Sequence, residues 1–175
     1  MRLRLVAAAV LAAVAAAAAC SAARPEPSVR APVVAPVESR PLSVELTAAR
    51  EWLENHAFRC ASRTIESGVA VRCVVDERSS RDGAYLVVDL LGSPAFVALI
   101  EATMDASAAE EPRFDGFGGF YGDTVLGLLP DRPAEEIDAW LRDHLTTSGT
   151  TETDGLVLEM TVDRTRSTLR VWQRR

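Results

Sequence analysis

The two histidines of the chain stand in nearly identical surroundings and are the residues best suited to acid–base chemistry. The sequence EWLENH at 51–56 recurs as AWLRDH at 139–144, so a tryptophan precedes each histidine by four positions. The charge of histidine changes near neutral pH, which makes His56 and His144 candidates for the general base of a hydrolase. The same spacing also fits a structural role, because positions i and i+4 lie on one face of a helix.

The residues around these histidines do not supply the partners that catalysis needs. Each histidine directly follows a polar residue, Asn55 or Asp143, and neighbouring helical residues point about 100° apart, so neither can orient the base beside it. The sequence contains no GxSxG, HExxH, P-loop or GxGxxG pattern. We therefore expect no catalytic residue, no cofactor and no metal site, and we keep a hydrolase using His56 or His144 as an alternative.

The composition narrows the class of partner. The 175 residues carry a formal charge of −6, and every one of the 19 basic residues is arginine. Proteins that hold nucleic acid present a basic surface, so we expect no nucleic-acid partner. With 48% hydrophobic and 25% charged residues, the chain has the composition of a globular protein long enough for one core.

Residues 1–19 form a predicted export signal. Arg2 and Arg4 precede an uncharged apolar run of 15 residues from Leu5 to Ala19. That run is shorter than the roughly 20 residues of a membrane-spanning helix. We therefore predict a signal peptide and an exported protein, with a transmembrane anchor as the alternative.

The end of this signal resembles the lipobox of bacterial lipoproteins. Residues 17–20 read AAAC, and in that family the chain is cut before the cysteine, whose thiol is then acylated. The resemblance implies a lipid on Cys20 that anchors the protein to the outer face of the cell membrane. Ala17 departs from the pattern, since a larger aliphatic residue is usual there. Cleavage after Ala23, which would yield a soluble secreted protein, is the alternative.

Acylation of Cys20 would leave an even pair among the three cysteines. Cys60 and Cys73 enclose 12 residues, and in an oxidising compartment a disulfide is the default state of such a pair. Closing a loop of this size stabilises a fold by about 3 kcal/mol in the chain-entropy model. We predict a Cys60–Cys73 disulfide.

A proline-rich segment separates the signal from the folded domain. Residues 20–42, which begin with the cysteine of the lipobox, contain five prolines and no amphipathic period. This composition predicts an extended tether between the membrane and a single domain at 43–175.

The domain is predicted to contain two copies of a helix–strand–strand unit, at 47–104 and 131–175, joined by 105–130. Each Trp–His hexapeptide belongs to an amphipathic helical pattern, and a turn glycine and two apolar strands follow it. The matching strand pairs are 69–75 with 84–91, and 156–162 with 167–173.

These elements predict an α+β fold, with an antiparallel sheet covered on one face by the two tryptophan helices. Trp52 and Trp140 are expected to anchor the helices in the core. Residues 95–104 are expected to form a further strand, with a helix as the alternative.

The segment between the two units is rich in aromatic residues and glycine. It holds four of the seven Phe and Tyr residues of the chain. One interpretation is an adaptable aromatic surface for a partner or ligand. The other is a short helix packed into the core, which the spacing of the aromatic residues also fits. The residues of this candidate surface are Phe114, Phe117, Phe120 and Tyr121.

The layout as a whole resembles small lipoproteins of unknown function from actinobacteria. The residues that carry this resemblance are Cys20, Trp52, Cys60, Cys73, Pro130 and Trp140. It covers most of the chain through short motifs, and the family has no established activity to transfer. We predict a non-enzymatic envelope lipoprotein that binds an envelope protein, and the alternative is a carrier of a lipid or small apolar ligand.

Overall fold

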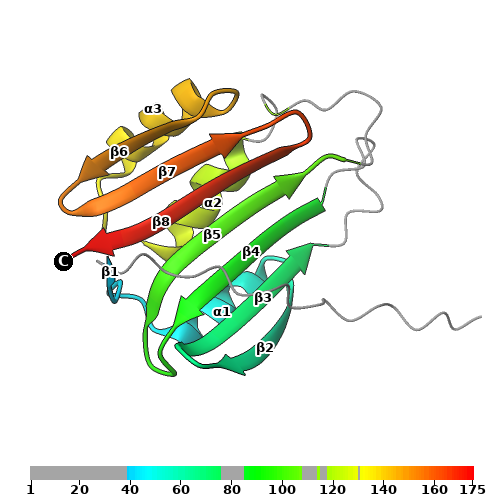
Figure 1. The fold of residues 1–175 in the computed structure, drawn as a ribbon, viewed down its shortest axis with the longest axis vertical. Coiled ribbons are helices and arrows are strands. Elements are labelled where there is room, and N and C mark those ends of the chain that lie inside the picture. The colour runs from blue at the N-terminus through cyan, green and yellow to red at the C-terminus, as the bar shows by residue number, and fades with distance from the viewer. Residues whose placement is uncertain (1–38, 76–84, 108–113, 115–117, 130) are drawn as a thin grey trace, which may run out of the picture.

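The computed structural model describes residues 39–75, 85–107, 114, 118–129 and 131–175. Within these ranges the chain forms one eight-stranded antiparallel sheet and three helices (Figure 1). The strands are β1 (Ser39–Arg40), β2 (Arg59–Ile65), β3 (Gly68–Val75), β4 (Tyr85–Gly92), β5 (Val97–Asp105), β6 (Gly149–Thr153), β7 (Leu156–Val162) and β8 (Arg166–Arg174). The helices are α1 (Leu46–Asn55), α2 (Gly118–Leu128) and α3 (Ala134–His144).

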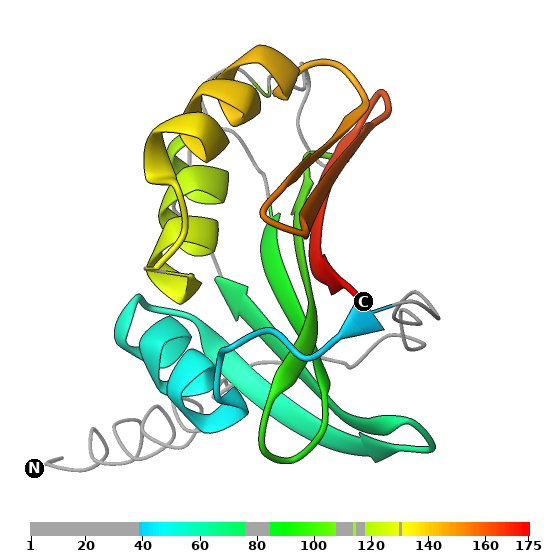
Figure 2. The same ribbon diagram turned by 90° about the vertical axis from the view of Figure 1, so that its left-hand side faces the viewer.

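The predicted α+β class is confirmed. The strand order is β2-β3-β4-β5-β8-β7-β6, and the short β1 pairs with the end of β8. Figure 2 shows the sheet nearly edge-on, with the helices on one side of it. Residues 95–104 fall mostly in β5, as a strand rather than a helix.

Alternating side chains of the strands build the core. One row of directly paired residues crosses five strands and is at most 2% exposed. Every second residue of a strand points to the same face, so this row and its neighbours give the helices an apolar surface. Apolar residues of all three helices pack on that surface. The row consists of Val71, Leu90, Ile100, Val171 and Leu158.

The predicted duplication of a helix–strand–strand unit is not confirmed. Three strands follow each tryptophan helix, because β2 and β6 precede the predicted pairs. From β5 outward, β4, β3 and β2 follow on one side of the sheet, and β8, β7 and β6 follow on the other. β4 and β8 are both antiparallel to β5, so they are parallel to each other. With α1 and α3 on the same face, the triplets are related as mirror images. A duplicated unit keeps its handedness and does not produce that relation.

The predicted disulfide is present. Cys60 on β2 and Cys73 on β3 are direct cross-strand partners, with their Cα atoms 4.0 Å apart. The bridge therefore ties the outermost strand to the sheet and lies beneath α1, where Cys73 is fully buried. In the part of the chain that the structure describes, no helix is both long and apolar enough to span a membrane.

Candidate functional site

The two Trp–His motifs adopt the same local geometry. The ring of His56 stacks on Trp52 with a centroid distance of 3.8 Å, and the ring of His144 stacks on Trp140 at 4.5 Å. In each pair the histidine Nδ1 donates to the carbonyl oxygen of the tryptophan four residues earlier, at 2.7 Å and 2.9 Å. These carbonyls lie near the carboxyl ends of α1 and α3, where a histidine side chain can bind the last carbonyls of the helix. The histidines thus cap the carboxyl ends of the helices.

Glycines on neighbouring elements make room for these pairs. A Cβ atom at Gly127 of α2 would lie 2.1 Å from the indole of Trp52, and one at Gly149 of β6 would lie 2.3 Å from the ring of His144. Both tryptophans are half-buried and pack against the core. The recurrence of the motif therefore has a structural cause, which is stacking, capping and close packing at a helix end.

The structure does not bring the two histidines together. α2 contacts both α1 and α3 and lies between the two helices that carry them (Figure 1). Within the described ranges, no group of three or more His, Cys, Asp or Glu residues is placed to hold a metal ion.

The described residues of the aromatic segment are buried or half-buried. Phe114 and Tyr121 are buried, and Phe120 is half-buried against the core, while Phe117 lies outside the described residues. The hydroxyl of Tyr121 donates to the carbonyl oxygen of Ser167 on β8 at 2.8 Å. Burial raises the pKa of Tyr121 to about 12. The described part of this segment follows the other interpretation, a helix packed into the core.

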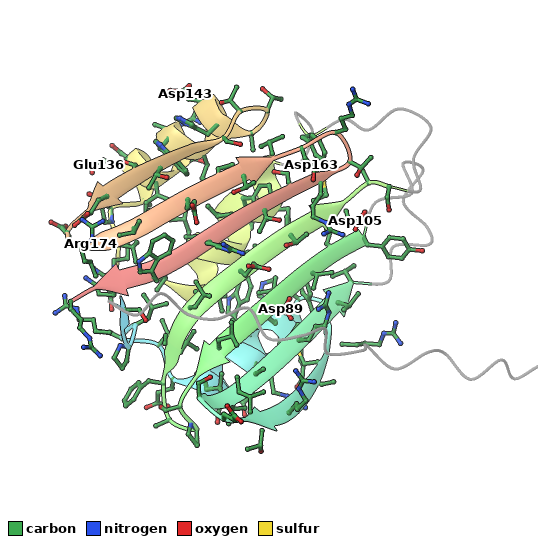
Figure 3. The ribbon with its side chains drawn as sticks, in the orientation of Figure 1. Asp89, Asp105, Glu136, Asp143, Asp163 and Arg174 are labelled. Carbon is green, nitrogen blue, oxygen red and sulfur yellow. A yellow bond between two sulfur atoms is a disulfide. The ribbon has the colours of Figure 1, made fainter. Side chains whose placement is uncertain are left out.

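The sheet face opposite the helices carries a different arrangement, which sequence reasoning did not identify. We call it the helix-free face. Figure 3 looks onto it and shows side chains of β4, β5 and β8 that point toward the viewer, Asp89 and Asp105 among them. Direct cross-strand pairing orders these side chains into bands that run across the strands.

The first band is apolar and runs from β3 to β7. Its members are Ala70, Leu91, Leu99, Trp172 and Val157, which we call the apolar row. Leu99 is 0% exposed and Val157 is 1% exposed, and Trp172 is the direct cross-strand partner of both. Ile65 of β2 packs against the same cluster.

The second band is charged and lies two residues away from the apolar row on each of the same five strands. Its members are Arg72, Asp89, Glu101, Arg170 and Glu159, which we call the charged ladder. Arg72 lies 3.5 Å from Asp89, and Arg170 lies 2.8 Å from Glu101 and 3.9 Å from Glu159. Asp89 and Glu101 stand directly opposite each other, an arrangement that is unfavourable for like charges unless cations flank them. The two arginines supply that compensation.

Beyond the ladder the face becomes polar and more exposed. Thr103 and Thr168 share a hydrogen bond of 3.2 Å, and Tyr85 at the start of β4 is 43% exposed. Arg166 donates to Asp105 at 2.6 Å. Burial raises the pKa of Asp105, but the hydrogen bonds from Ser107 and Arg166 outweigh it, so the net pKa lies below the ordinary value.

The sequence of β8 contains one signal for this face. Along β8 the residues between the core positions are Arg166, Thr168, Arg170, Trp172 and Arg174, a mixture of charge and one large aromatic side chain. A solvated sheet face is usually polar throughout, so the tryptophan is the informative residue.

A scan against protein-family models, a search of curated proteins and a search of solved structures each found no match to this chain.

Proposed function

We propose that the protein is an exported, lipid-anchored module that binds a partner protein of the cell envelope through its helix-free face. The observation that carries the proposal is the apolar row next to the charged ladder on a face that the described helices leave uncovered. Interfaces between proteins combine an apolar centre that includes an aromatic or arginine side chain with a surrounding polar rim. Trp172 and Arg170 supply those residue types on one strand.

The ladder favours a protein partner over a small apolar ligand. Its ion pairs present both signs of charge in a fixed order, which selects a partner of complementary pattern. The side chain of Arg170 is 43% exposed, so it can contact a partner. The side chain of Glu101, which is 11% exposed, fixes the position of Arg170 through their ion pair. The space between sheet and helices is occupied by one continuous cluster of buried hydrophobic side chains, which also supports an interaction module over a carrier.

The placement in the envelope rests on the sequence. The predicted signal at 1–19, the lipobox cysteine Cys20 and the proline-rich tether support export and a lipid anchor. The Cys60–Cys73 disulfide supports an oxidising compartment, because disulfides persist there and are rare in the cytosol. A tether of this kind would hold the domain away from the membrane, with its binding face accessible to other envelope proteins.

Site-specific cross-linking tests the proposal. A photoreactive amino acid replaces Thr161, an exposed residue of β7 on the helix-free face, in the organism that produces the protein. The matched control replaces Asp143, an exposed residue of α3 (labelled in Figure 3). We expect one discrete protein adduct from position 161 and none from position 143. Equal adducts from both positions, or adducts from 143 alone, would contradict the proposal.

A further inference from the structure

Strand β2 is held to the sheet more weakly than the strands that follow it. It lies at one edge, where its backbone pairs with β3 and with no other described strand (Figure 1). None of its residues is fully buried, whereas β3 and β4 each carry several buried side chains. The backbone hydrogen bonds to β3 and the Cys60–Cys73 disulfide are therefore the principal attachments of β2.

The segment that can detach has defined limits. Phe58, which directly precedes β2, is buried, and its amide donates to the carbonyl oxygen of Leu53 at 3.1 Å. At the other end Gly68 has a φ of 137°, and a Cβ atom there would lie 2.1 Å from the carbonyl oxygen of Gly92. Glycine is the residue that adopts such a conformation readily and changes it readily. Residues 59–67 therefore lie between a fixed point and a flexible joint.

The core does not depend on this segment. The row of Val71, Leu90, Ile100, Val171 and Leu158 crosses β3, β4, β5, β8 and β7, and its members are at most 2% exposed. The buried side chains of α1 pack in the same core cluster. Loss of β2 from the edge would leave these contacts in place.

We propose that the Cys60–Cys73 disulfide is a redox switch. A dithiol opens the bridge, and residues 59–67 then leave the sheet while the other strands stay folded. The released state exposes the backbone edge of β3 and carries two free thiols. Oxidation of those thiols closes the bridge again and restores β2 to the edge.

The exposure of the two cysteines sets the course of the reduction. Cys60 is partly exposed on the outermost strand, whereas Cys73 is 0% exposed, so a thiolate of the dithiol attacks the sulfur of Cys60. The S–S bond breaks, and its electron pair goes to the sulfur of Cys73, which takes up a proton. The second thiol of the dithiol then displaces Cys60 from the mixed disulfide. The protein gains two electrons and two protons, and the dithiol is oxidised to a disulfide.

Release of β2 also alters the helix-free face. Ile65 of β2 packs against the cluster of Ala70, Leu91 and Leu99, and it leaves that cluster with the strand. The consequence for binding rests on the proposed function: a partner on this face loses the contact with Ile65, so reduction weakens its binding.

Hydrogen–deuterium exchange of the purified protein, read by mass spectrometry with and without dithiothreitol, tests the inference. After reduction the amides of Arg59–Ile65 should exchange about a hundredfold faster, because the bridge no longer constrains the open segment. The amides of β4, β5 and β8 should keep their exchange rates. Strand β6 is the internal control, since it lies at the opposite edge and also lacks a fully buried residue but carries no disulfide, so its exchange should not respond.

The variant Cys60→Ala with Cys73→Ala provides a second route to the open state. Its β2 amides should exchange rapidly whether or not dithiothreitol is present. Unchanged protection of β2 after the bridge has opened would overturn the inference. A loss of protection in all strands together would also overturn it, because the effect would then be global unfolding. So would a bridge that excess dithiothreitol leaves closed in the folded protein.

Partner affinity separates this inference from the proposed function. Reduction should weaken binding of the cross-linked partner at least about fivefold, as the loss of one apolar contact at an interface does. If β2 is released but partner binding is insensitive to changes on the helix-free face, the proposed function fails and the redox switch stands. If partner binding requires the face but β2 stays protected after reduction, the redox switch fails alone.

Discussion

Replacing Gly127 by alanine tests the close packing that explains the Trp–His motif. The new Cβ would lie 2.1 Å from Cζ2 of Trp52 and within 2.7 Å of two further ring atoms. The indole cannot yield easily, because His56 stacks on it and the core supports it. Overpacking of this kind costs about 1–3 kcal/mol. Alanine is favoured over glycine inside a helix by about 1 kcal/mol, so the net destabilisation should be about 0–2 kcal/mol.

Gly119 in the same helix provides the matched control. A Cβ there would meet only a side-chain oxygen of Asp123 at 3.9 Å, and the residue is exposed. Gly119→Ala should therefore stabilise the protein by about 0.5–1 kcal/mol through helix propensity alone. Chemical denaturation measures both free energies of unfolding.

A double-mutant cycle isolates the contact with Trp52. In a Trp52→Ala background the new methyl group of Gly127→Ala has no ring to meet, so it should stabilise by about 1 kcal/mol, as in the control. The coupling energy between the two positions should be about 1–3 kcal/mol. A Gly127→Ala variant that stabilises the wild-type protein as much as Gly119→Ala does would refute the reasoning.

Two other predictions concern the disulfide and the buried tyrosine. Replacing both Cys60 and Cys73 by alanine should lower the free energy of unfolding by about 3 kcal/mol, and a reductant should then have no further effect on the melting temperature. Because the pKa of Tyr121 is raised to about 12 in the folded protein, its contribution to stability is full below pH 10 and is lost as the pH rises toward 12. Tyr121→Phe should flatten this alkaline loss, and should lower stability by about 1 kcal/mol at neutral pH through the missing hydrogen bond to Ser167. An unchanged alkaline slope in that variant would show that Tyr121 is not the group responsible.

The fold class followed from the sequence because its signals are local. Alternation of apolar residues predicted β3 and β7, the polar turns after them led to β4 and β8, and the amphipathic stripes predicted α1 and α3. The edge strands β2 and β6 were missed because an edge strand need not bury either face. β2 reads RCASRTI and β6 reads GTTET, and neither shows an apolar alternation. The strand order, which does not confirm the predicted repeat, depends on long-range pairing that no local pattern encodes.

The candidate site was missed for a similar reason. The charged ladder joins Arg72, Asp89, Glu101, Arg170 and Glu159 from five strands, and only the register brings them into one line. The predicted site was instead a cluster of residues that are close along the chain, the aromatic segment around Tyr121. Local clustering of aromatic residues does not separate a surface from a core helix, and here the described residues of the cluster are largely buried.

The most direct measurement of the central claim is the dissociation constant of the cross-linked partner for the purified variant Thr161→Arg. Thr161 is exposed on the helix-free face, and arginine there adds bulk and charge without removing a core contact. Thr146→Arg, at an exposed position just after α3, is the control of equal charge. The account predicts at least tenfold weaker binding for Thr161→Arg, about 1.4 kcal/mol, and unchanged binding for Thr146→Arg. Equal affinities for the two variants would contradict a partner on the helix-free face.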